Sequence, residues 1–334
     1  MEEAIRSILN APELLAHYEK NFQQLRDFGT AQHPTPMKIG GRIFGVSETD
    51  IYTEPEKYME EALCSLADQV SRPLQEPIFY HLAIENWIYG VHFTDKVFGT
   101  DVFYKPETGM WNTRCLKTPV GSLQKPELAA NETWQLAVRI AEAYLSFDVK
   151  GVFFVPPVIA SPLNVAVNLY GAEFLIAMLE EPEAARHDLR IITDIQIEMH
   201  RWYREHIPAD RLQMICGCRI QPPGYGQLCG CSTQLVSPAL YEEFIMPLDD
   251  ELLGVYPHGG LIHLCGSHGH LIPLFAKMKN LKSFQLNDRA SEELALYAQG
   301  LREDQIIYLL PCDGMPEERA VEIARTMRPK MILA

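Results

Sequence analysis

The chain has 334 residues, of which 47% are hydrophobic and 22% are charged. This composition is that of a globular protein with a large core, and it excludes a disordered or fibrous chain. The formal net charge of −15, without any Lys/Arg-rich run, argues against binding to nucleic acid or to an anionic membrane. The first residues lack the apolar stretch of a signal peptide, and no stretch approaches the roughly 18 apolar residues of a membrane span, so we expect a cytoplasmic protein.

Strand-like and helix-like segments alternate from about residue 78 to the end. In chain order they are a helix at 55–71, a strand at 78–84, a helix at 132–147, a strand at 151–158, a helix at 182–205, a strand at 212–218, a helix at 237–253, strands at 260–266 and 281–288, a helix from 291 to about 300, a strand at 305–312, a helix from 315 and a strand at 330–333. The strands are apolar without strict alternation, which is typical of a parallel sheet covered on both faces.

This order predicts a (β/α)8 barrel over residues 76–334, with residues 1–75 as a helical extension packed on it. A nucleotide-binding open sheet is the weaker alternative, because the chain has neither G-x-G-x-x-G after a first strand nor G-x-x-x-x-G-K-[ST].

The segment GGLIHLCGSHGH at 259–270 carries the strongest chemical signal. His263 and Cys265 stand two residues apart at the end of a predicted strand, so their side chains point to the same face. Cys312 ends another predicted strand, and the carboxyl ends of barrel strands form the active-site mouth. The three residues predict a zinc site with a fourth position open for water or a substrate thiol. From spacing alone, ordinary buried thiols and a core histidine remain the alternative.

Six of the eight cysteines lie between residues 216 and 312, and in a reducing compartment such thiols are more often metal ligands, catalytic groups or core residues than disulfides. Cys216 with Cys218, and Cys229 with Cys231, form two C-G-C pairs. Each pair is tighter than the usual C-x2-C, so we expect structural, redox-inert cysteines. A second metal site, or a lid over the first, is the alternative.

Polar side chains at the ends of predicted strands are candidates for substrate binding, because such ends line the pocket of a barrel. They are Tyr80, Glu85, Asn86, Cys218, Asn287 and Asp288. Asp288 is equally suited to cap the following helix. His268 and His270 are expected to begin a helix rather than to bind metal.

Five segments, taken in order, resemble the uroporphyrinogen decarboxylase superfamily and, within it, the corrinoid-dependent methyltransferases. They are VFGTDVFYKPETGMW (97–111), MLEEPEAARHDLRIITD (178–194), LVSPALYEEFIMPLDDELL (235–253), IHLCGSHGHLIPLFAKMKNLKSFQLND (262–288) and LLPCDGMPEERAVEIARTMR (309–328). The resemblance covers most of the chain from about residue 55 and implies a (β/α)8 barrel. In that branch an H-x-C pair and a later cysteine bind zinc, which implies His263, Cys265 and Cys312 here.

The resemblance implies a zinc-dependent methyltransferase that moves a methyl group between a small molecule and a corrinoid (methylcobalamin), with the zinc activating the substrate at His263, Cys265 and Cys312. A partner protein would carry the corrinoid, because nothing in the chain resembles a cobalamin domain. Thiols, methoxylated aromatics, methylamines and tetrahydrofolate all fit as the methyl donor or acceptor. The alternatives are a metal-free decarboxylase or lyase of the same fold and a non-catalytic metal- or corrinoid-binding protein. KIGGRIFGV (38–46) stands where the decarboxylases carry an arginine-rich motif, which argues against porphyrinogen decarboxylation.

Overall fold

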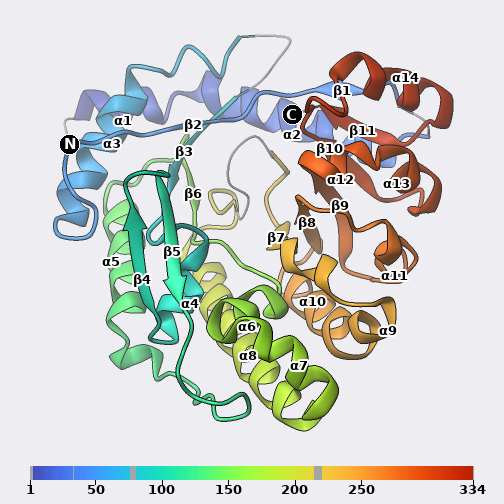
Figure 1. Cartoon of the computed structure of the whole chain (residues 1–334). Helices are drawn as coiled ribbons and strands as arrows, with labels where there is room; N and C mark the ends of the chain where they lie inside the picture. Colours follow the sequence, from blue (N-terminus) through green and yellow to red (C-terminus); the bar gives the residue numbers. More distant parts are fainter. Residues whose placement is uncertain (1–2, 33, 76–79, 214–219, 334) are drawn as a thin grey trace.

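The structure is a computed structural model that describes residues 3–32, 34–75, 80–213 and 220–333 (Figure 1). The strands are β1 (Met37–Lys38), β2 (Arg42–Phe44), β3 (His81–Glu85), β4 (Asp101–Lys105), β5 (Met110–Arg114), β6 (Phe153–Val155), β7 (Gly226–Cys229), β8 (Gly260–Leu264), β9 (Leu281–Leu286), β10 (Ile306–Leu309) and β11 (Lys330–Leu333). They form a six-stranded sheet in the order β1-β11-β10-β9-β8-β7, a three-stranded sheet β2-β3-β6 and the hairpin β4-β5. The pairings of the two larger sheets are parallel, and the hairpin is antiparallel.

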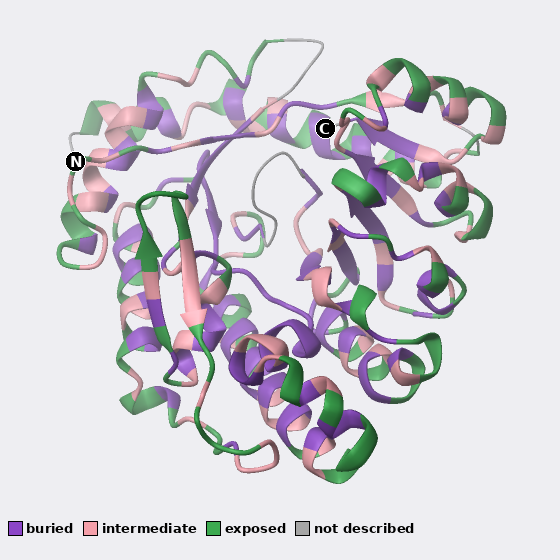
Figure 2. Ribbon diagram, viewed as in Figure 1, coloured by how far each residue is buried: buried purple, intermediate pink, exposed green. Residues whose placement is uncertain are grey.

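Helices surround these strands (Figure 1), and their outward faces are exposed while the strands of the two larger sheets are largely buried (Figure 2). The α-helices are α1 (Glu3–Leu9), α2 (Pro12–Thr30), α3 (Pro55–Ala67), α4 (Phe93–Val97), α5 (Glu132–Ser146), α6 (Pro162–Tyr170), α7 (Ala172–Glu180), α8 (Pro182–His206), α9 (Pro238–Leu240), α10 (Met246–Leu253), α11 (Ile272–Phe275), α12 (Asp288–Glu292), α13 (Leu294–Gly300) and α14 (Glu317–Met327). Single turns are η1 (Gly90–His92), η2 (Leu128–Ala130), η3 (Cys231–Leu235), the π-helical η4 (Tyr241–Ile245) and η5 (Gly269–Leu271).

The predicted α/β class with parallel strands is confirmed, whereas the predicted closed (β/α)8 barrel is not found among the described residues. Between β6 and β7 the described backbone makes only isolated parallel bridges, Phe154 with Leu212 and Ala160 with Cys229. The prolines at 156–157 and 222–223 flank β6 and β7, and proline has no N–H to donate to a ladder. The predicted strand at 212–218 is described only at its first two residues.

Residues 1–75 hold helices, as predicted, and they also hold β1 and β2. β1 pairs with β11 and β2 pairs with β3, so this segment contributes strands to both larger sheets. Helix α2 buries Leu14, Tyr18, Phe22 and Leu25 at helical spacing. The Tyr18 hydroxyl accepts a hydrogen bond of 3.0 Å from the backbone N–H of Leu82, which fixes α2 against β3. The division of the chain at residue 75 stays a prediction.

The longer predicted helices are found as α3, α5 and α8, and the predicted helix at 237–253 is found as α9, η4 and α10 in succession. The Ser237 hydroxyl caps this last unit by accepting from Leu240 N at 3.3 Å. The strands and α-helices that were not predicted include β1, β2, β7, the β4-β5 hairpin, α4, α6 and α7. In the part of the chain that the structure describes, no single helix is long and apolar enough to cross a bilayer. Helices α6 and α7, which meet at 110°, have the required length and apolar character only when they are taken together.

Helix α10 buries a carboxyl group. Asp249 is fully buried, and the Tyr241 hydroxyl donates to its Oδ2 at 2.9 Å. Burial raises the pKa of Asp249 from 3.8 to about 7, because the charged form loses its solvation, and the hydrogen bond from Tyr241 only partly opposes this. Folding therefore favours the protonated carboxyl.

Asp249→Asn is expected to change the pH dependence of stability. Because the pKa of Asp249 is higher in the folded than in the unfolded state, this residue contributes its full stabilisation below about pH 4. That contribution is lost as the pH rises to about 7. The loss amounts to at most about 4 kcal/mol, and asparagine abolishes it. Denaturant unfolding of both proteins at pH 5 and pH 8 measures the difference. Equal losses of stability in both proteins between these pH values would contradict the assignment.

Candidate metal centre

Four metal-ligating side chains lie at the carboxyl ends of the adjacent strands β7 and β8. Cys229 is the last residue of β7 and Cys231 begins η3, while His263 lies in β8 and Cys265 follows that strand directly. Cys229 and His263 are register partners in the parallel ladder. Because register partners point to the same face of a sheet, the thiol and the imidazole converge there.

The spacing of the donor atoms fits a tetrahedral metal ion. The Sγ atoms of Cys229 and Cys231 are 3.7 Å apart, and those of Cys231 and Cys265 are 2.9 Å apart. The ligand atoms of Cys229, Cys231 and His263 all lie within 4.8 Å of one another. Two thiolates bound to zinc at about 2.3 Å in a tetrahedron lie about 3.8 Å apart. The first pair therefore already has the separation of a zinc site, and the second would open by about 0.9 Å.

A hydrogen-bond chain behind His263 sets its tautomer. Nδ1 of His263 contacts Oε1 of Gln285, and Nε2 of Gln285 donates to Oδ1 of Asn287. Because a carbonyl oxygen can only accept, Nδ1 carries the proton and Nε2 keeps its lone pair. A partner of this kind orients a ligating histidine and raises its basicity.

The three thiols share their protons unequally. Hydrogen bonding with Cys231 lowers the pKa of Cys229 and of Cys265, and His263 lowers both further. The pKa of Cys231 is raised, because its thiol bonds to both neighbours and is desolvated. Thiolates are the metal-binding form of cysteine, so a cation placed among these three atoms would displace the shared proton.

The backbone around the thiols is held from two sides. Asn164 of α6 contacts Cys229 Sγ through Nδ2 at 3.6 Å, and its Oδ1 accepts from Ser232 N at 2.8 Å. Gly230 N donates to His263 O at 2.9 Å. A Cβ at Gly230 would lie 2.6 and 2.8 Å from two carbons of the buried Ile262 side chain, so a larger residue here would have to displace that side chain.

The structure places the predicted ligand Cys312 in a different setting. Cys312 lies in a turn beyond β10, where it bridges to Met315, and β9 stands between β8 and β10. Its thiol donates to the backbone oxygen of Asp288 at 3.5 Å. The structure thus brings the predicted ligands His263 and Cys265 together with Cys229 and Cys231, which were expected to be structural. The C-x-C spacing of 229 and 231, which repeats the H-x-C spacing of 263 and 265, was the available signal.

Two predicted substrate residues lie near this centre or beside Cys312. Asn287 supports Gln285 as described, and Asp288 is exposed with φ 47° at the start of α12. Cys218, like Cys216, lies outside the described residues.

The two histidines beyond Cys265 contact backbone oxygens: the ring nitrogens of His268 face Gly266 O at 2.8 Å and Gly230 O at 3.3 Å, and Nε2 of His270 faces Val236 O at 3.1 Å.

The other three predicted substrate residues belong to β3 and its flanks. Tyr80 precedes the strand at its amino end, with the Arg72 guanidinium 5.5 Å from its ring centre. Glu85 is the last residue of the strand and is half-buried. Asn86 is buried, and its Nδ2 points to Ala137 O of α5 at 3.5 Å.

No family model matches the chain, and no curated protein matches it by sequence. Among solved structures, a methyltransferase from Methanosarcina mazei superposes with a TM-score of 0.63 at 11% sequence identity. The match covers 93% of this chain and 90% of the other. At this identity the likeness shows a shared fold.

Proposed function

We propose that this chain is a zinc-dependent methyltransferase whose metal is bound by Cys229, Cys231, His263 and Cys265. The observation that carries the proposal is the convergence of Cys229, Cys231 and His263, whose ligand atoms lie within 4.8 Å of one another, with the Cys265 thiol 2.9 Å from that of Cys231. The fold shared with a protein named as a methyltransferase, over nearly the full length of both chains, supports the reaction class.

The donor set determines the kind of ion. Three thiolates and an imidazole suit zinc, and a catalytic zinc site keeps one position for substrate, so a substrate would take the place of one of the four side chains during the reaction. When bound, zinc would lower the pKa of a substrate thiol or polarise a methylated oxygen or nitrogen. The residues of the chain have supporting tasks: Gln285 orients His263, and Asn164 fixes the loop that carries Cys229 and Cys231.

The methyl carrier in this proposal is a corrinoid on a partner protein, and the second substrate is a small methyl donor or acceptor. The sequence segments that resemble the corrinoid-dependent branch support both, above all IHLCGSHGHLIPLFAKMKNLKSFQLND (262–288). That segment contains the proposed ligands His263 and Cys265 and also Gln285, which contacts His263. The residues that carry the resemblance are therefore also residues of the proposed metal centre.

Free methylcobalamin and a small thiol such as 2-mercaptoethanesulfonate test the reaction directly. The sulfur is expected to take the methyl group while the bonding electron pair stays on cobalt, which changes the visible spectrum. Zinc-loaded protein should be faster than the chelator-treated protein by at least roughly tenfold, which is about 1.4 kcal/mol of barrier. Two results would refute the proposal. One is methyl transfer at equal rates with and without zinc. The other is the absence of methyl transfer, in either direction, between the corrinoid and thiols, methylamines or phenols. Metal-independent release of CO2 from a carboxylated substrate would favour the lyase instead.

A further inference from the structure

A cavity opens at the end of the strands opposite the proposed metal centre, at the amino ends of β8, β9 and β10. Its volume is about 620 Å³, and its wall includes Gly259, Ser283 and Ile306 from these strands and the C-terminal turn of α2. Small-molecule sites in proteins span roughly 300–1,000 Å³. The thiols lie at the carboxyl ends, so this cavity is separate from the proposed metal centre.

The inner wall of this cavity is polar and buried. The Ser283 hydroxyl donates to Gln221 Oε1 at 3.0 Å, and the Tyr308 hydroxyl donates to Ile220 O at 3.0 Å. Gln221 is only 5% exposed, and within the described structure its Nε2 has no hydrogen-bond partner. A buried donor left unpaired costs about 1–3 kcal/mol, so an acceptor atom of a ligand would be stabilised here.

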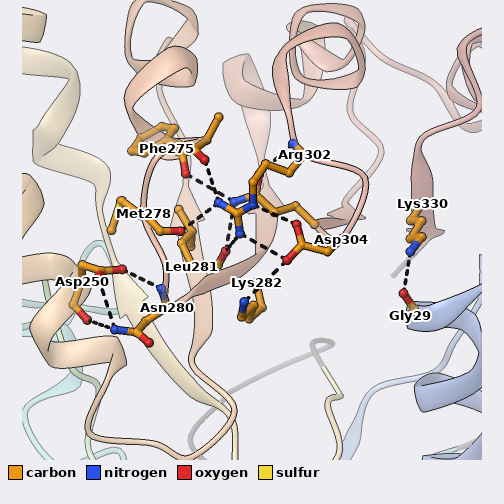
Figure 3. Close-up of polar contacts among 12 residues, drawn as sticks. Gly29, Asp250, Phe275, Met278, Asn280, Leu281, Lys282, Arg302, Asp304 and Lys330 are labelled. Atoms are coloured by element: carbon orange, nitrogen blue, oxygen red, sulfur yellow. Dashed lines mark hydrogen bonds and ion pairs between the residues drawn. The ribbon is translucent and has the colours of Figure 1, made fainter.

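The rim of the cavity is positively charged. Arg26, Lys279 and Lys282 line it together with one acidic residue, Asp304. Asp304 is shared between Lys282 at 3.5 Å and the Arg302 guanidinium at 2.8 Å, so its charge is already matched (Figure 3). In a chain with a net charge of −15, such a wall concentrates small anions from solution.

A pair of aromatic rings completes the wall. Tyr225 and His258 lie with their ring centres 5.3 Å apart beside the cations. We infer that this cavity binds a small organic anion with a flat ring. A phosphate or carboxylate group would meet Lys279 and Lys282, the ring would contact Tyr225 and His258, and an acceptor atom would reach Gln221 Nε2.

Phenyl phosphate carries both an anionic group and a flat ring, and calorimetric titration of the full chain measures its binding. Saturable binding of one molecule per chain is expected, at least about tenfold tighter than inorganic phosphate, a difference of about 1.4 kcal/mol. Lys279→Gln should weaken phenyl phosphate by about tenfold, and Tyr225→Leu should reduce its affinity to that of phosphate. Lys117→Gln, at an exposed lysine outside the cavity, is the matched control and should bind as the parent does.

Three outcomes would overturn the inference. The first is no saturable binding of phenyl phosphate below about 10 mM, a weak limit of about −2.7 kcal/mol. The second is binding that Lys279→Gln leaves unchanged. Equal affinity for phosphate and phenyl phosphate would overturn the ring requirement. None of these measurements involves zinc or methyl transfer, so they stand apart from the proposed reaction.

Discussion

Replacing Cys231 with serine is expected to abolish zinc binding, because Cys231 is the thiol that contacts both of the others. Structural zinc sites bind with roughly 10–16 kcal/mol, or about 3 kcal/mol for each of four ligands. Loss of one thiolate should therefore lower the affinity by at least about 100-fold. Elemental analysis of protein purified without added metal is expected to give about one zinc per chain for the parent and almost none for Cys231→Ser.

Cys312→Ser is the matched control, because it removes a thiol from the neighbouring part of the same sheet. The geometry predicts that this variant keeps its zinc, since the Cys312 thiol bonds to a backbone oxygen. Gln285→Met leaves all four donors and should weaken zinc by about 10–100-fold, as expected for a residue that orients a ligand. If Cys312→Ser loses zinc while Cys231→Ser retains it, the ligand set predicted from the sequence is right and the proposed one is wrong.

The parallel α/β architecture was predictable because buried parallel strands have a distinctive composition. Segments such as GLIHLCG (260–266) and LKSFQLND (281–288) are short and largely apolar, and they correspond to β8 and β9. Strand β7 escaped prediction because its four residues, GQLC, follow two prolines and a glycine that indicate a loop. The partners of β7 are distant in sequence, and no local pattern reveals them.

The candidate site was predictable to the extent that its ligands share one strand. The spacing of His263 and Cys265 indicates a common face, and the structure agrees. Cys229 and Cys231 were expected to be structural because a C-G-C pair looks too tight for one metal. The chain leaves β7 at Cys229 and turns through Gly230 into η3, and this turn brings the two thiols to 3.7 Å. Only the pairing of β7 with β8 places them beside His263.

Arg302→Met is expected to destabilise the fold by about 3 kcal/mol, because one guanidinium joins the segment after α11, the start of β9 and Asp304 (Figure 3). Nη1 donates to Ala276 O and Met278 O beyond α11, both at 2.8 Å, and Nη2 donates to Leu281 O at the start of β9 at 3.1 Å. Nε pairs with Asp304 at 2.8 Å. Methionine fills similar space but donates nothing, so the carbonyl groups of Ala276 and Met278 would depend on water in a partly buried setting, whereas Leu281 O keeps the bond from Gln305 Nε2 at 2.9 Å.

Guanidinium chloride unfolding measures this loss, and two variants sharpen it. Arg302→Lys keeps the charge but cannot donate in a fork, so it should recover only about 1 kcal/mol. Arg201→Met, at an exposed arginine of α8, should stay within about 0.5 kcal/mol of the parent. A loss below about 1 kcal/mol in Arg302→Met would show that water replaces the guanidinium at these carbonyl groups. Full recovery in Arg302→Lys would show instead that charge, rather than the geometry of the fork, holds α11 to β9.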